Sequence, residues 1–410
     1  MPRLYHGWIV VVVSTIVLFV NASVVFSFGV FFKPMLEDLD CGRAVLSGCY
    51  SLALVLGAFC GILGGKLSDK FGLRVMLTSN GILLGIGYLL MSRASSVQQI
   101  YLFYILVSLG LSCSLVPIIS TIPRWFVEKR GLATGIAVAG VGLGGLATPL
   151  LSQWLISLYG WHQSYAILGL ASLVIIIPLA QLIKHKPPEV TVAAYTKSTG
   201  VKNRQPLDST SRGFSYTEAI KTRQFWIFFL MMFCFFFSLQ TVIVHIVPYA
   251  TDMGIPETIA AGILATISGM SIAGRVGIGF LSDKIGNRLS MCSCLTVATL
   301  GLVGFVFARE VLVFYAIVFF FGMAYGGILP LVSTTAAQLF DIRSLGVING
   351  SITFGGILGG SLGAFLGGLI FDMTGNYMPI LLIAVVLCAL SICLSLILFT
   401  RGNDVATTRA

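Results

Sequence analysis

Long apolar runs, separated by short polar segments, make up most of the 410-residue chain. Twelve such runs begin near Trp8, Ala44, Val75, Gln99, Gly131, His162, Phe225, Thr258, Leu289, Val311, Gly346 and Met378. A helix needs about 20 mainly apolar residues to cross the hydrocarbon layer of a bilayer. The pattern therefore predicts an all-α membrane protein with twelve transmembrane helices, placed in the cell membrane and surrounded by lipid.

A polar stretch rich in Lys, Thr and Ser, Lys184–Arg223, separates six runs from six. We expect an N-terminal six-helix bundle over 1–184, a linker over 185–223 and a C-terminal six-helix bundle over 224–410. On the side of the termini and linker we count 20 Lys and Arg, and on the other side only Lys33, Arg43, Arg93 and Arg309. Because cytoplasmic loops carry the excess of Lys and Arg, both termini and the linker are predicted to be cytoplasmic.

The composition agrees with a membrane protein and argues against a nucleic-acid-binding protein, a disulfide-rich protein and an enzyme. Only 10% of the residues are charged, against about a quarter in soluble domains. The net charge of +10 reflects the loop asymmetry, so no nucleic-acid partner is expected. Nine Cys without regular spacing, four His, and 15 acidic residues placed mostly in loops give no disulfide framework, enzyme site or metal site. No phosphate-binding loop is present either, and we expect no cofactor.

One ten-residue segment occurs twice. Gly65–Arg74, GKLSDKFGLR, returns as Gly279–Arg288, GFLSDKIGNR, 214 positions later. Equivalent residues continue the match at offsets of 213 to 215: Pro117 with Pro330, Gly131 with Gly346, and Gly135 with Gly350. We infer two related halves around a pseudo-twofold axis along the membrane normal. Paired halves of this kind commonly form transporters with the substrate between them near the midplane.

The duplicated segment resembles the cytoplasmic loop signature of the major facilitator superfamily, which joins the second and third helices of each half. The resemblance covers essentially the whole chain. It implies a cytoplasmic gate, for which the candidates are Asp69, Arg74, Asp283, Arg288 and Arg130. In this interpretation the two Asp carboxylates lie against helix N-termini and the contacts break when that side opens. The alternative is a solvated tight turn.

A narrower resemblance lies at the fifth run, where Trp125–Gly140 is similar to the fifth-helix signature of monocarboxylate transporters and their oxalate/formate antiporter relatives. His6–Trp8 resembles part of the first-helix signature of the same group, without its acidic residue and second Trp. His245–Asp252 is similar to the end of the seventh helix. The resemblance implies a carrier of small carboxylates.

Arg275 is the one basic residue well inside a span, about six residues from its cytoplasmic end. A charge at that depth is expensive and marks a functional site by default. The planar guanidinium fits a carboxylate with two parallel hydrogen bonds, and Ser268 and Ser271 extend a polar stripe at helical spacing. The family resemblance implies the same role for this Arg. The alternative is that Arg275 snorkels to lipid headgroups.

The number of buried cations favours a substrate with one carboxylate. Ser271 stands where animal members of the family have an Asp, so no acidic residue in the eighth run pairs with Arg275. Oxalate antiporters have a second basic residue in the eleventh helix, but Leu345–Phe371 contains none. Further substrate-site candidates are Tyr325 as a donor, Phe28 and Phe354 as apolar walls, and Asn349 and Ser114 as polar liners. The alternatives are a Tyr325 hydroxyl bonded to a backbone carbonyl, and Phe side chains that face lipid or the core.

Proton coupling requires a group that titrates, and His245 and Asp252 are the candidates. A structural His bonded to the backbone is the alternative, and Lys33 is expected to be solvated at the outer mouth. Glycines at spacing four, such as Gly140 with Gly144 and the Gly355–Gly367 series, indicate either sliding or tight packing of helices.

The sequence therefore predicts a monomeric, proton-coupled symporter of lactate- or pyruvate-like monocarboxylates. The alternatives are an anion exchanger of the oxalate/formate type and a non-transporting sensor on the same fold.

Overall fold

The computed structural model describes residues 6–126, 130–183, 216–340 and 345–400. Within these ranges the regular structure is entirely helical. The helices are α1 (His6–Phe26), α2 (Phe28–Leu39), α3 (Arg43–Phe71), α4 (Leu73–Met91), α5 (Val97–Ser112), α6 (Leu115–Trp125), α7 (Arg130–Gln181), α9 (Tyr216–Ala219), α10 (Arg223–Asp252), α11 (Glu257–Phe307), α12 (Val311–Phe340), α13 (Leu345–Thr374) and α14 (Met378–Thr400).

These helices confirm the predicted membrane spans once breaks and fusions are allowed for. One span is formed by α1 and α2, and another by α5 and α6. By contrast, α7 and α11 each contain two spans that meet at a single non-helical glycine, Gly160 or Gly286. In the part of the chain that the structure describes, eleven stretches are long and apolar enough to cross a membrane, and one of them is the 50-residue Leu132–Gln181. Divided at Gly160, that stretch gives the twelfth span.

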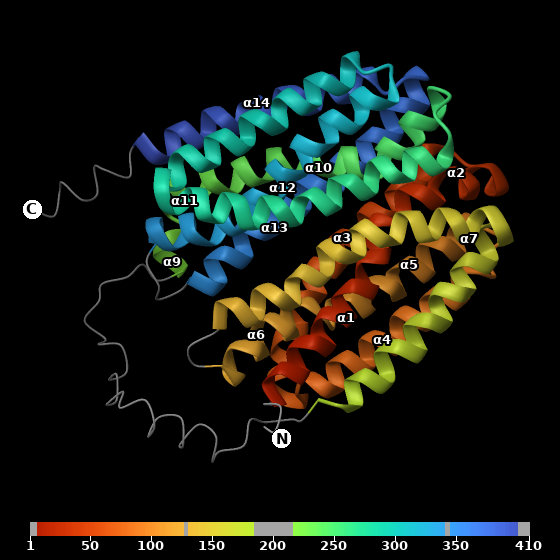
Figure 1. Ribbon diagram of the computed structural model, residues 1–410, viewed down its shortest axis with the longest axis horizontal. Coiled ribbons are helices and arrows are strands. Elements are labelled where there is room, and N and C mark those ends of the chain that lie inside the picture. Colours follow the sequence, from red (N-terminus) through yellow and green to blue (C-terminus); the bar gives the residue numbers. More distant parts are fainter. Residues whose placement is uncertain (1–5, 127–129, 184–215, 341–344, 401–410) are drawn as a thin grey trace, which may run out of the picture.

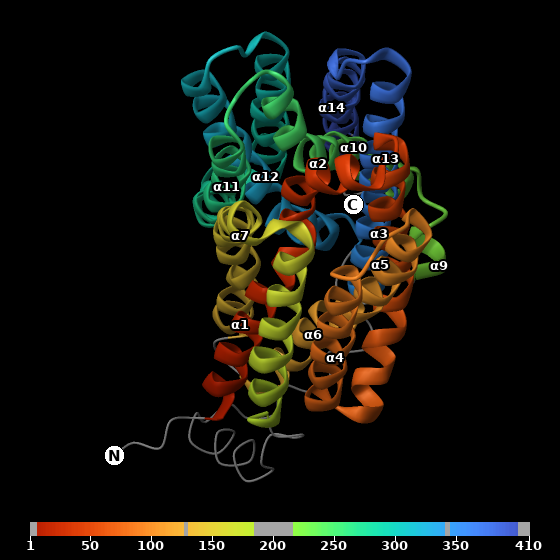
Figure 2. The same ribbon diagram turned by 90° about the vertical axis from the view of Figure 1, so that its right-hand side faces the viewer.

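Two bundles meet along one half of their length (Figures 1 and 2). The N-terminal bundle contains α1 to α7 and the C-terminal bundle contains α10 to α14. We call the end at which Gln181 and Tyr216 lie the linker end, and the opposite end the far end. In Figure 1 the bundles are joined toward the far end, at the right, and diverge toward the linker end, where α6 and α9 lie apart. The predicted linker falls largely outside the described residues, apart from α9.

The backbone shows the duplication more fully than the sequence does. Six described residues have positive φ, and they form three pairs: Asp40 with Gly254, Gly72 with Gly286, and Gly160 with Gly375. The separations are 214, 214 and 215 residues, the offset of the repeated segment. Gly72 and Gly286 even share φ and ψ within about 2°, at 82° and 161° against 84° and 160°. Equivalent turns therefore reverse the chain in both halves.

The glycine series pack helices together inside each bundle. Gly140 and Gly144 of α7 lie against the backbone carbonyls of Thr15 and Phe19 of α1. In the other half, the glycines of the Gly355–Gly367 series of α13 lie against α10. They contact the Phe229 ring, the Phe233 and Phe237 carbonyls, and the His245 ring. Each contact joins two helices of one bundle, so these glycines give tight packing, and they do not form the surface on which the bundles slide. Close approach of this kind supplies the dispersion energy that holds helices together in lipid.

The bundles contact each other along two seams. In one seam α3 runs beside α13, and the Ser51 hydroxyl donates to the Ser361 carbonyl at 2.7 Å. In the other seam α7 runs beside α11, where Gly145 leaves room for Ser268. Between them Gly29 of α2 lies against the Val244 carbonyl of α10, so a Cβ there would be 3.0 Å from the oxygen. These contacts close the far half of the protein.

A glycine contact in the C-terminal bundle gives a stability test. A Cβ on Gly326 of α12 would overlap the backbone of Ser271 of α11, whereas a Cβ on Gly135 would meet no atom within 4 Å. Overpacking typically costs about 1–3 kcal/mol, so Gly326→Ala should lower the melting temperature of the detergent-solubilised protein by several degrees. The control Gly135→Ala should leave it unchanged or raise it, because Ala is the better helix former. An equal loss in both variants would contradict this packing.

Candidate functional site

Arg275 points across the seam between the bundles. Its side chain leaves α11, and Nη1 donates to the Val138 carbonyl of α7 at 3.3 Å. The side chain is half-buried, and its Nε is buried without a hydrogen-bond partner. These contacts contradict the snorkelling alternative, because the guanidinium is directed at the opposite bundle and not at the lipid headgroups.

The surroundings of Arg275 contain little negative charge. Among the described residues, no Asp or Glu lies within ion-pair distance of its guanidinium. A guanidinium has five N–H donors, and the single carbonyl bond satisfies one of them. A partly buried cation without a counter-ion is unfavourable. The site is therefore suited to accept an anion.

The predicted polar stripe divides between two neighbouring helices. Ser268 is fully buried on the α7 side, against Gly145, and its Oγ has no hydrogen-bond partner. Ser271 donates to the Ser268 carbonyl at 2.7 Å, and its backbone lies against Gly326 of α12. Ser268 and Arg275, seven residues apart on α11, therefore both lie at the seam with α7, whereas Ser271 lies on the α12 side.

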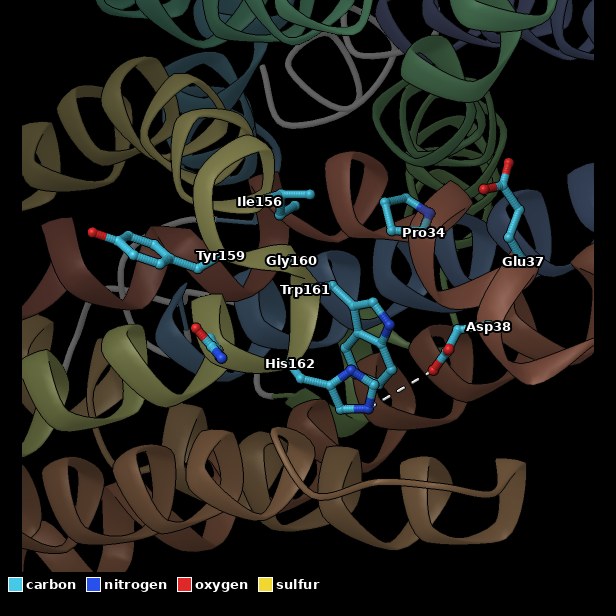
Figure 3. A pocket seen from close by; sticks show the side chains of 9 residues that line it. Pro34, Glu37, Asp38, Ile156, Tyr159, Gly160, Trp161 and His162 are labelled. Carbon is cyan, nitrogen blue, oxygen red and sulfur yellow. Dashed lines mark ion pairs between the residues drawn. The ribbon is translucent and has the colours of Figure 1, made fainter.

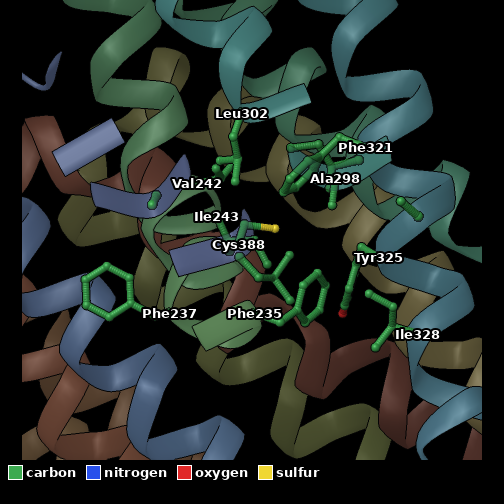
Figure 4. Packing of buried hydrophobic residues seen from close by; sticks show 14 of the residues in the cluster. Phe235, Phe237, Val242, Ile243, Ala298, Leu302, Phe321, Tyr325, Ile328 and Cys388 are labelled. Carbon is green, nitrogen blue, oxygen red and sulfur yellow. The ribbon is translucent and has the colours of Figure 1, made fainter. Parts of the chain in front are cut away.

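Two aromatic candidates are packed inside the bundles in this conformation. Tyr325 is 8% exposed and lies among Phe235, Phe321 and Ile328 in the C-terminal core (Figure 4). Phe28 is 1% exposed and belongs to the N-terminal core. Their substrate contacts stay predictions, since the surrounding atoms here are protein atoms.

The remaining candidates lie at separate places. Phe354 of α13 meets Phe59 of α3 across the bundle interface, with ring centroids 5.1 Å apart. Asn349 donates to the Ser333 hydroxyl at 2.8 Å, near the linker end. Ser114 donates to the Leu111 carbonyl at 2.8 Å, at the break between α5 and α6. The structure does not bring these three residues together with Arg275.

Sequence reasoning missed a buried polar pair between the bundles. Gln240 of α10 donates through Nε2 to the Tyr50 hydroxyl of α3 at 2.9 Å, and both side chains are buried. Tyr50 in turn stacks on Phe28, with centroids 4.6 Å apart. A signal was present in the sequence, because Gln240 has an amide side chain within a mainly apolar run. An amide that is buried away from water needs a hydrogen-bond partner.

The proton-coupling candidates lie near the far end, in one connected group. His245 is buried, with Nε2 2.8 Å from the Ala364 carbonyl and Nδ1 3.3 Å from the Tyr377 hydroxyl. Asp252 forms ion pairs with Lys33 at 3.3 Å and with Arg43 at 2.7 Å. The backbone bond anticipated for His245 is therefore present. Lys33, expected to be simply solvated, has a counter-ion.

The predicted cytoplasmic gate is described only in part. Arg74 donates through Nε to the Gln181 Oε1 at 2.8 Å, a contact within the N-terminal bundle. Arg288 is exposed. The side chains of Asp69, Asp283 and Arg130 lie outside the described residues. A gate between the bundles at the linker end remains a prediction.

A cavity of about 600 Å³ lies near the far end, away from Arg275. It is lined only by the N-terminal bundle, from α2 and from α7 around Gly160 (Figure 3). His162 stacks on Trp161 there, with centroids 3.7 Å apart, and lies 3.8 Å from an Asp38 carboxylate oxygen. A substrate site between the halves needs residues from both bundles, so this cavity is a separate feature.

Comparison with known proteins gives the same fold and family. The structure resembles a bacterial homologue of the human lysosomal transporter Spinster in an inward-facing and occupied conformation, with a TM-score of 0.78 and 16% identity, covering 98% of this chain and 99% of the other. It also resembles a mutant of the nucleoside transporter NupG, with a TM-score of 0.75 and 13% identity over 96% and 100% of the two chains.

Curated relatives match over nearly the whole chain. The oxalate:formate antiporter of Oxalobacter formigenes is 28% identical, covering 88% of this chain and 84% of its own length. Monocarboxylate transporter 13 of Rattus norvegicus is 28% identical over 90% and 84%, and human monocarboxylate transporter 2 is 28% identical over 90% and 80%. The model of the Major Facilitator Superfamily matches residues 14–364 and 274–409. The relatives named above are membrane transporters and not enzymes. The chain therefore belongs to the Major Facilitator Superfamily of transporters.

Proposed function

We propose that this transporter carries small organic anions with a single carboxylate, such as lactate or pyruvate, and that Arg275 binds the carboxylate. The observation that carries the proposal is the position of this guanidinium. It spans from one bundle to the other and has one carbonyl contact, at 3.3 Å. A carboxylate in its place would form two charge-assisted hydrogen bonds, which are shorter and stronger than the existing one.

The charge of the site favours a monoanion. Arg275 and one carboxylate together are neutral, and a neutral pair is displaced through a low-dielectric interior at much lower cost than a lone cation. A dicarboxylate would leave a second negative charge. The eleventh span, Leu345–Thr374, offers no Lys or Arg to balance it. The names of two relatives, both monocarboxylate transporters, support this choice of substrate class.

Alternating access follows from the arrangement of the bundles. In this conformation the far ends are joined and the linker ends diverge (Figure 1). With the linker on the cytoplasmic side, as the Lys and Arg distribution predicts, this is an inward-facing form. Rotating one bundle against the other would open the far end and expose Arg275 to the outside.

Anion exchange is the second candidate, and the relative named oxalate:formate antiporter favours it. Both candidates use the same anion site. They differ in whether the carrier takes up a proton with the anion and returns empty, or must return with a second anion.

The first functional prediction concerns the anion anchor. In proteoliposomes, Arg275→Ala should reduce uptake of labelled lactate and pyruvate by at least about 100-fold, since hydrogen bonds to charged groups contribute roughly 1.5–3 kcal/mol each. Arg275→Lys should also be strongly impaired because an ammonium cannot pair in bidentate fashion. The control Arg223→Ala removes an exposed Arg at the start of α10 and should retain uptake. Undiminished transport by Arg275→Ala would remove the assignment.

The second functional prediction separates the two modes of transport. With external pH below internal pH, net lactate uptake into empty proteoliposomes should rise, and a protonophore should abolish the stimulation. An exchanger would instead show little uptake into empty vesicles. It would require an internal anion such as formate, whatever the pH difference.

A further inference from the structure

At the far end, Arg43 of the N-terminal bundle contacts several groups of the C-terminal bundle. Its guanidinium donates through Nη1 to an Asp252 oxygen and to the Tyr377 hydroxyl, each at 2.7 Å. The guanidinium carbon also lies 3.6 Å from the centre of the Phe371 ring. These partners come from α10, from α13 and from the turn that joins α13 to α14. Arg43 therefore binds three parts of the opposite bundle at once.

A carboxylate of the C-terminal bundle also caps the helix that Arg43 begins. Asp372 of α13 accepts hydrogen bonds from the backbone N–H groups of Arg43 at 2.9 Å and Ala44 at 2.7 Å, one at each oxygen. The N-terminus of a helix attracts negative charge because its first N–H groups lack partners. The cap position is Gly42, and a Cβ there would be 2.7 Å from the Asp372 Oδ2. Helix α3 thus obtains its N-terminal cap from the other bundle.

We define the latch as the four charged residues Lys33, Arg43, Asp252 and Asp372. Their charges are divided between the two bundles. Both cations belong to the N-terminal bundle and both carboxylates to the C-terminal bundle, so the closed latch has no net charge. When the far end opens, Asp252 loses both cations and Asp372 loses the N–H groups that begin α3. A carboxylate that has lost its cations takes up a proton more readily.

The second seam shows that a charged latch is not needed merely to hold the bundles together. There Gln153 of α7 donates to Glu257 of α11 at 2.8 Å. Glu257 is 214 residues after Arg43, so the two are equivalent under the duplication. The equivalent contact therefore has a neutral amide in place of an ion pair. Among the described residues, the ion pairs between the bundles lie where α2 and α3 meet α10.

We propose that Asp252 and Asp372 form the proton-binding site of the transport cycle, and that the proton and Arg43 compete for them. With the far end closed, Arg43 and Lys33 pair with Asp252, and Asp372 accepts from the N–H groups that begin α3. With it open, a proton from the far side binds instead, and the protonated latch still closes but less favourably, because Arg43 and Lys33 then leave an excess positive charge. This inference rests on the proposed function, since it assigns the coupling site of the same carrier.

The site has a connection toward the interior. Tyr377 contacts both Arg43, at 2.7 Å, and His245 Nδ1, at 3.3 Å. Beside them, Thr241, His245, Tyr249 and Tyr377 line a cavity of about 10 Å³, close to the space of one water molecule. Among the described residues, the titratable and charged groups at the latch are Lys33, Asp40, Cys41 and Arg43 from α2, α3 and their loop, His245 and Asp252 from α10, and Asp372 and Tyr377 from α13 and the following turn. Behind them, Tyr101 of α5 lies beside Cys41, and Tyr249 lies between Tyr377 and Arg309.

The test measures how readily the far end opens, and no substrate is added. Ser51 is buried in the α3 seam, so Ser51→Cys in a Cys41→Ser parent reports opening through its reaction with a membrane-impermeant thiol reagent added outside intact cells. Labelling rates at pH 7.5 to 4.5 are divided by those of the unfolded protein at the same pH, which removes the intrinsic pH dependence of the thiol. The Asp252→Asn/Asp372→Asn variant should label at least 10-fold faster than the parent at pH 7.5, with no pH dependence. The parent should approach that rate as the pH falls.

The control variant is Gln153→Ala, which loosens the other seam and keeps both carboxylates. Its labelling should still rise as the pH falls. The proposal is overturned if the double Asn variant retains the parent's pH dependence, or if it labels no faster than the parent at any pH. Because substrate is absent, neither outcome depends on which anion is carried.

A transport measurement shows whether the double Asn variant is folded. It should keep counterflow of labelled lactate between equal internal and external concentrations, since exchange does not require release of the proton. It should lose acid-stimulated net uptake by at least 10-fold. Retained acid stimulation would overturn the assignment of the proton site.

Discussion

A cation in a low-dielectric interior must find a negative charge, and this requirement organises the interface between the two bundles. At the far end, Lys33 and Arg43 both form ion pairs with Asp252 of the opposite bundle. Deeper in the interface, the Val138 carbonyl is the one hydrogen-bond acceptor that the described residues offer Arg275, and its Nε is buried without a partner. The described part of the interface thus contains ion pairs at the far end and, at Arg275, a cation without a counter-ion. The ion pairs hold the present conformation, and we propose that Arg275 is where an anion binds.

The duplication supplies the scaffold, and departures from it supply the chemistry. Equivalent turns at Gly72 and Gly286 reverse the chain with nearly the same φ and ψ. By the same offset, however, Arg275 is equivalent to Gly61, and Arg43 to Glu257. A symmetric pair of bundles is suited to rocking because each half presents a similar surface to the other. We propose that the asymmetric distribution of charge gives that motion its substrate and its coupling ion.

The membrane spans were predictable from sequence because lipid imposes a simple rule. Each span needs about 20 apolar residues and must satisfy its own backbone, so the predicted starts near Ala44, Phe225 and Met378 lie within a few residues of the helix starts at Arg43, Arg223 and Met378. The breaks at Ser27 and between α5 and α6 were not predicted. They interrupt helices without interrupting the apolar pattern.

The site was predictable only where a single residue carried the signal. Arg275 stood out because no other basic residue lies so far inside a span, but its direction toward α7 depends on packing between residues 137 positions apart. The Arg43 latch joins residues more than 200 positions apart in sequence, and each partner taken alone resembles an ordinary charged residue at a helix end. The pair of Tyr50 and Gln240 is hidden for the same reason. Long-range pairing is set by tertiary structure and leaves no local pattern.

In the proposed function, the bond between Arg275 and Val138 connects substrate binding to the movement of the bundles. Its acceptor is a backbone carbonyl, so the contact depends on the relative position of α7 and α11 and not on the identity of the side chain at 138. An incoming carboxylate competes for the guanidinium with the carbonyl that joins the seam. Binding of the anion therefore weakens an interbundle contact while it neutralises the charge, and both effects lower the cost of moving one bundle against the other. The interaction that selects the substrate is then also one that frees the carrier to change conformation.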